Sequence, residues 1–247
     1  MASRSRSRTP SPAQIRNAYF GRHGSTWSLT GSLMGSTLLY MGLYLLVAAG
    51  GVVAANASGL TRVVAGSGIV ALLPFFVLLF VVSSAMSRAI GHVTQELALG
   101  AIMMLVVSPF LGMALAYGLA ASPAAVLSAS VAAGGSVVVT AAIAFVSPWD
   151  LTKLSGLALV GLVGLLITEL LAMVLGAATG LVLSPLWSMI GIAVFELYLV
   201  VDFSRMRQAM AYGPNDGLAA YLGLNLALDV VNLFLYFLML FVGGSRR

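Results

Sequence analysis

Four acidic residues interrupt apolar sequence in the second half of this chain, and they are its clearest candidates for chemistry. They are Glu169, Glu196, Asp202 and Asp229. An ionised carboxylate at the centre of a lipid bilayer costs on the order of 3 kcal/mol on insertion scales, so an acid retained there is a functional candidate. Asp229 lies near the middle of the last apolar stretch, whereas Asp202 lies near the end of the preceding one, just before Arg205. We therefore expect proton or cation chemistry rather than covalent catalysis.

Polar residues accompany Asp229 at helical spacing. The series steps by four, four, three and four residues through Tyr221, Asn225, Asp229, Asn232 and Tyr236. Such spacing places them on one face of a helix. A polar stripe on an otherwise apolar helix must face protein or water rather than lipid. Two interpretations stay open: a hydrogen-bonded seam between helices, or an ion pathway.

Asn225, Asn232 and Tyr236 are candidates for hydrogen-bond support or for lining an ion pathway. Glu169 and Glu196 are further candidates, although either could instead be protonated and silent.

Two carboxyl groups held together in a poorly solvated site cannot both ionise cheaply, and they titrate as one unit. If Asp202 and Asp229 met in the fold, they would form a proton-responsive pair. The spacing alone does not bring them together. A second interpretation of Asp202 is an acid at the membrane boundary that Arg205 and Arg207 neutralise.

The elements that must position these residues are transmembrane helices. The chain has a mean hydropathy of +1.05 and only 8% charged residues, against roughly 25% in soluble domains, so lipid is its main solvent. A bilayer core of about 30 Å needs about 20 apolar residues of helix. Seven stretches qualify: Leu29–Ala55, Val63–Ser87, Leu97–Ala120, Pro123–Ser147, Leu154–Gly180, Pro185–Phe203 and Leu218–Val242. We predict an all-α polytopic protein, with a basic disordered tail (1–28), a seven-helix domain (29–243) and a short basic end (244–247).

Composition also excludes several functions. There is no cysteine, the two histidines (His23 and His92) lie in loop-like sequence, and so does the single lysine, Lys153. A zinc site needs three or four converging ligands, and no nucleophile–base pair is visible. We therefore expect neither an enzyme nor a bound cofactor.

The distribution of basic residues predicts the orientation. With the amino terminus inside, nine lysines and arginines fall in inner segments and three in outer ones, which favours this orientation. The arginines of the first 22 residues are then a cytoplasmic tail rather than a nucleic-acid site. On the same ground we expect a bacterial plasma membrane.

Three motifs resemble the Bax inhibitor-1 family, also called the transmembrane Bax inhibitor motif family. Residues 224–238, Leu-Asn-Leu-Ala-Leu-Asp-Val-Val-Asn-Leu-Phe-Leu-Tyr-Phe-Leu, are similar to the final helix of that family. Residues 201–206, Val-Asp-Phe-Ser-Arg-Met, resemble the end of its sixth helix, although Phe203 and Ser204 replace a threonine and a glutamine. Residues 150–156 resemble the turn before its fifth helix. The match is good over about residues 140–247.

The resemblance implies a seven-helix bundle with the last helix at its centre, and a pH-sensitive calcium leak channel. It implies that Asp202 and Asp229 form a hydrogen-bonded pH sensor, which could also offer oxygen ligands to Ca²⁺. Arg88 matches the arginine that pairs with the first aspartate. The expected partners are thus the lipid bilayer, calcium ions and protons, with Ca²⁺ as the permeant ion. Two alternatives remain: a proton-coupled secondary transporter, and a non-conducting membrane protein that regulates or binds other proteins.

Overall fold

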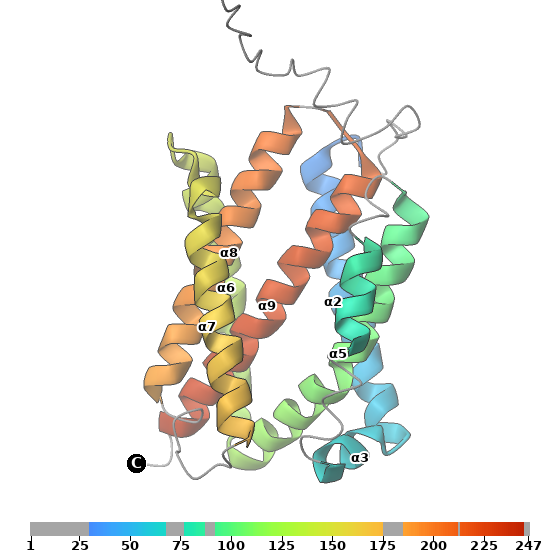
Figure 1. Ribbon diagram of the computed structural model, residues 1–247, viewed down its shortest axis with the longest axis vertical. Coiled ribbons are helices and arrows are strands. Elements are labelled where there is room, and N and C mark those ends of the chain that lie inside the picture. The colour runs from blue at the N-terminus through green and yellow to red at the C-terminus, as the bar shows by residue number, and fades with distance from the viewer. Residues whose placement is uncertain (1–29, 68–76, 87–91, 175–184, 212, 245–247) are drawn as a thin grey trace, which may run out of the picture.

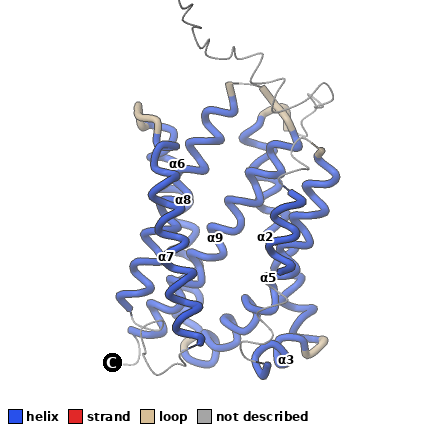
Figure 2. The backbone as a smooth tube through the Cα atoms, viewed as in Figure 1, coloured by secondary structure: helices blue, strands red, loops and turns tan. Residues whose placement is uncertain are grey.

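The computed structural model describes residues 30–67, 77–86, 92–174, 185–211 and 213–244. Within these ranges all regular structure is helical (Figure 2). Six of the helices in the described ranges are long and apolar enough to cross a membrane. They are α2 (Leu33–Ala57), α5 (Val93–Ala121), α6 (Pro123–Val146), α7 (Ser155–Val174) with the preceding 3₁₀ turn η1 (Leu151–Leu154), α8 (Pro185–Met210) and α9 (Asp216–Gly244).

The second predicted span, Val63–Ser87, is described only in pieces. Its first part belongs to α3 (Leu60–Ser67), and a shorter apolar helix covers Val77–Met86. Residues 68–76 and 87–91 lie outside the described ranges. Neither described piece is long enough to cross a bilayer, which needs about 20 residues, so the predicted number of seven spans stays a prediction.

The boundary with the weakest sequence signal, at Ser122-Pro123, is a sharp break between α5 and α6. Ser122 adopts an extended conformation (φ −165°, ψ 107°), and its hydroxyl accepts a hydrogen bond from the Ala125 amide. Proline restricts the preceding residue to extended backbone, and proline itself suits the first position of a helix because it has no N–H to leave unpaired. The serine and the proline therefore end one helix and begin the next.

The last two helices both extend further than the hydropathy pattern predicts. The sixth stretch was expected to end at Phe203, but α8 continues to Met210, and Gly213 follows with a φ of +89°. The last helix begins at Asp216, where the Asn215 side chain accepts a hydrogen bond from the Leu218 amide at 2.9 Å. The polar residues beyond Phe203 do not stop a helix; they only end the apolar pattern. Asp202 thus lies well inside α8.

The last helix occupies the centre of the bundle. It packs against α2, α5, α6 and α8, and Figure 1 shows it crossing the middle of the molecule. Leu226, Ala227 and Leu233 on α9 are almost fully buried. The helix approaches α2 closely at Gly223, where an added Cβ would lie 2.8 Å from the Thr37 carbonyl oxygen. Residues on α9 are therefore surrounded by protein.

Helix α7 lies at the periphery. It packs mainly against α8 and η1, and Leu157 and Val160 leave 63% and 70% of their surfaces exposed. Leucine and valine side chains turned outward in a membrane helix face lipid. The inward face of α7 carries Leu162 and Glu169.

Candidate functional site

A cavity of about 300 Å³ lies between α8 and α9. It has room for several water molecules, since one water occupies about 30 Å³ of the liquid. Its polar lining comes from α8 and α9, and Leu162 of α7 contributes to one wall. The lining residues are Leu162, Phe195, Tyr198, Asp202, Arg205, Tyr221, Asn225, Leu228, Asp229 and Asn232.

Asp202 and Asp229 both line this cavity, one from each of two packed helices. They are 3% and 7% exposed, and they lie close enough to interact electrostatically. Oδ2 of Asp229 is buried and has no hydrogen-bond partner within the described ranges. The hydrogen bond that the resemblance implied between the two carboxyl groups is not formed among the described residues. The two acids share a cavity, with space between α8 and α9 for water or an ion.

The cation paired with Asp202 is Arg205, one turn further along α8. Its Nη1 donates to Oδ1 of Asp202 at 2.7 Å, and its side chain is 45% exposed. Arg207, the other arginine considered, instead donates to the backbone carbonyls of Ser147 and Trp149 at 2.5 and 3.0 Å. The proposed partner Arg88 lies outside the described residues, so its role stays a prediction.

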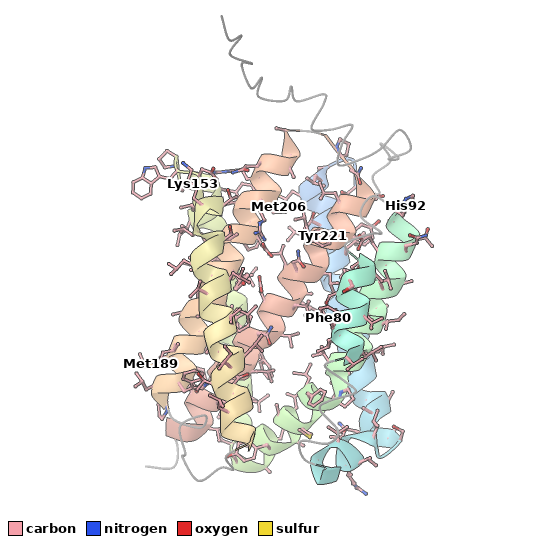
Figure 3. The ribbon with its side chains drawn as sticks, viewed as in Figure 1. Phe80, His92, Lys153, Met189, Met206 and Tyr221 are labelled. Atoms are coloured by element: carbon pink, nitrogen blue, oxygen red, sulfur yellow. The ribbon has the colours of Figure 1, made fainter. Side chains whose placement is uncertain are left out.

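The polar stripe of α9 divides between two environments. Tyr221, Asn225 and Asn232 line the cavity together with Asp229. Figure 3 shows Tyr221 near the same end of the bundle as Met206 and Lys153, whereas Met189 lies towards the opposite end. We call the end with Lys153 the basic end. Spacing on the helix predicted a common face, and the structure shows that this face opens onto a cavity for most of its length.

Tyr236, the last member of the stripe, contacts a different set of residues. Its hydroxyl donates a hydrogen bond to Oε1 of Glu169 on α7. Its ring stacks on Phe195 with 5.7 Å between centroids, and it lies against Gly191 of α8. Glu169 therefore has a partner, but that partner is not the aspartate pair.

Glu196, on α8, is half-buried and is not among the residues that line the cavity. It stays a candidate without a contact that assigns it a role.

Three residues were not singled out from the sequence. Tyr198 lines the cavity one turn before Asp202, a spacing that could have identified it. Glu96 is fully buried, and neither of its carboxylate oxygens has a hydrogen-bond partner in the described part of the chain. The hydroxyl of Tyr44 donates to the Glu96 backbone carbonyl at 3.2 Å. In the sequence Glu96 resembles an ordinary acid in the first turn of a helix, where the helix dipole favours negative charge.

The cavity offers oxygen atoms suited to a hard cation. Carboxylate and amide oxygens are ligands of Ca²⁺, which takes six to eight oxygens and accepts water among them. Among the described residues, however, no group of three or more His, Cys, Asp or Glu side chains surrounds one point.

Fold and site together define a polytopic α-helical membrane protein in which two buried aspartates line a cavity between the last two helices. The family model for the inhibitor of apoptosis-promoting Bax1 matches residues 30–247. The chain belongs to that family, which confirms the resemblance seen in its last third and extends it over nearly the whole chain. No curated protein matches the chain.

Proposed function

We propose that this protein is a pH-sensitive calcium leak channel of the membrane, gated by Asp202 and Asp229. The observation that supports it most directly is that both carboxyl groups line one cavity between α8 and α9. Ca²⁺ is the permeant ion rather than a cofactor, and no enzymatic step is required. By the distribution of basic residues, the basic end faces the cytoplasm of a bacterial cell.

The gate depends on an imbalance of charge. Arg205 compensates the charge of Asp202, but Oδ2 of Asp229 has no partner among the described residues. Burying an unpaired carboxylate is costly, so the proton is retained on such a group until the pH rises. With that proton present, α8 and α9 pack together.

When the proton leaves, Asp229 and Asp202 repel each other across the cavity, and their oxygens become available to Ca²⁺. Separation of the two helices gives a switch only if they have two discrete packings.

Purified protein in liposomes tests the proposal. Ca²⁺ uptake is expected to rise from about pH 6 to about pH 8, a range that a buried carboxyl group can reach. Asp229→Asn and Asp202→Asn should each flatten the pH profile. Glu196→Gln removes an acid of α8 that lies outside the cavity, and this variant should retain the pH profile of the parent protein. Uptake equal to that of empty vesicles at every pH would refute the channel, whereas uptake with an unchanged profile in both Asn variants would refute the gate.

The description of the family favours a second candidate, a non-conducting regulator of other membrane proteins. Such a regulator gives no flux above empty vesicles, and its Asp229→Asn variant retains partner binding. The liposome measurement separates the two functions.

A further inference from the structure

The ring of Tyr236 is wedged between α8 and the end of the cavity that lies away from Arg205. Phe195 lines the cavity and also stacks on Tyr236, with 5.7 Å between centroids and 29° between planes. The ring also lies against Gly191, where an added Cβ would come within 2.3 Å of it. Tyr236 is only 6% exposed. The two rings therefore fill the space between helices beyond Asn232, the last cavity residue of α9.

Glu169 lies beyond these rings and fixes one of them. It accepts the hydrogen bond of the Tyr236 hydroxyl, and it is not among the residues that line the cavity. Because α7 packs mainly on α8 and η1, this bond ties the peripheral helix to the central one. A half-buried carboxylate is expensive in a membrane unless it is paired, and Tyr236 provides the pairing.

The distance along α9 from Asp229 to Tyr236 gives Glu169 a place on the path of a cation. Tyr236 is seven residues beyond Asp229, which is about 10 Å at 1.5 Å per residue. A cation that leaves the aspartate pair in this direction meets the rings of Phe195 and Tyr236 and loses part of its hydration shell as it passes them. Beyond the rings it needs polar groups that take the place of the lost water. Glu169 is the carboxylate at that place.

We propose that Phe195 and Tyr236 form a barrier that closes the cavity on the side away from Arg205, and that Glu169 holds Tyr236 in position and presents a second carboxylate to a cation that passes. The cation pathway rests on the proposed function. The barrier itself does not, so the two are tested separately.

Cysteine modification tests the barrier without any ion flux. The chain has no cysteine, so Asn232→Cys places a single thiol in the cavity. A membrane-impermeant thiosulfonate is added to either face of oriented vesicles. Modification is expected from the basic end only, and Phe195→Ala should expose the same thiol to both faces. Modification from both faces, or from neither, before Phe195 is removed would overturn the barrier, as would unchanged protection in the Phe195→Ala variant.

Substitutions at the hydrogen bond test the role of Glu169. Tyr236→Phe retains the ring but loses the hydroxyl. In this variant, the thiol of Asn232→Cys should be modified roughly tenfold faster from the membrane face opposite the basic end, which is the effect of losing one hydrogen bond to a charged group. Glu169→Leu should have the same effect. Glu169→Gln retains an acceptor oxygen and should keep the protection. Tyr117→Phe changes an exposed tyrosine of α5 and serves as the control for general loosening.

Flux measurements then test the second carboxylate. Glu169→Gln should lower the ratio of Ca²⁺ to Na⁺ flux while leaving the pH profile unchanged, because the aspartate pair is intact. An unchanged ratio would overturn the cation role of Glu169. Absence of flux in the unmodified protein would refute the proposed function instead, and the result of the cysteine experiment would still decide the barrier.

Discussion

Arg205 and Asp202 form an ion pair across one turn of α8, with Nη1 of the arginine 2.7 Å from Oδ1 of the aspartate. The carboxylate is buried and the guanidinium is half-exposed. The positive charge that balances Asp202 therefore lies at the exposed edge of the cavity. Asp229, on the facing helix, has no such cation among the described residues. In the proposed gate, this asymmetry makes Asp229 the acid whose proton controls the net charge of the cavity.

Removing the cation should destabilise the fold. Arg205→Ala leaves Asp202 buried without its partner, and we expect a loss of about 1–2 kcal/mol, less than for a fully buried pair because the exposed guanidinium is partly screened. Unfolding in detergent micelles measures it. Arg205→Lys keeps the charge and should lose less. Equal stability of the alanine variant and the parent protein would contradict the pairing.

The close approach of α9 to α2 should make Gly223 intolerant of any side chain. A Cβ there would meet the backbone at Thr37 and Met41 at 2.8 and 2.9 Å. Backbone cannot rotate away, so Gly223→Ala should destabilise the protein by about 1–3 kcal/mol. Gly135 on α6 has no heavy atom within 4 Å of the same position, so Gly135→Ala should be neutral or slightly stabilising in the same unfolding measurement. A neutral Gly223→Ala would show that the two helices are further apart.

Ser108 should contribute to the contact between α5 and α2. Its hydroxyl lies 3.1 Å from the Ala48 carbonyl of α2 and 2.6 Å from the Met104 carbonyl of its own helix. Ser108→Ala removes the link between helices, and we expect a loss of about 0.6 kcal/mol, typical of such bonds in membranes. Among the described residues, Ser130 on α6 bonds only within its own helix, to Val126. Ser130→Ala is therefore the matched control, and equal effects of the two variants would contradict a bond between helices.

The loop before η1 should make a contribution to the free energy of unfolding that is lost at acidic pH. The hydroxyl of Thr152 and the side chain of Gln208 donate to Asp150 at 2.5 and 2.7 Å, and the Thr152 hydrogen bond is the main cause that lowers the pKa of Asp150. A lowered pKa means that this contribution is complete above the ordinary aspartate pKa and is lost as the pH falls through the lowered value.

Thermal unfolding at a series of acidic pH values measures that contribution. Asp150→Asn should unfold with a shallower dependence on pH than the parent below about pH 4, near the ordinary aspartate pKa. Gln208→Ala should weaken the same dependence in part. Superimposable pH profiles of Asp150→Asn and the parent would contradict the hydrogen-bonded loop.

The sequence determined the solvent of this protein and the positions of most of its helices, because a bilayer imposes a length and an apolar composition that one segment satisfies alone. It also placed Tyr221, Asn225, Asp229 and Asn232 on one face, since helical periodicity is a local property. It missed the full length of α8, because polar residues end an apolar pattern without ending a helix. It did not single out Glu96, because burial by distant helices leaves no local sign in the sequence.

Only the tertiary structure decided which acids meet. Asp202 and Asp229 face one cavity because α8 packs against α9, whereas Glu169 pairs with Tyr236 because α7 contacts α9 further along the same stripe. The choice of Arg205 rather than Arg207 as the partner of Asp202 depends on side-chain direction at the end of α8, where Arg207 reaches the carbonyls of a distant loop. Pairing between helices follows from the packing of the whole bundle, and no single segment carries that information.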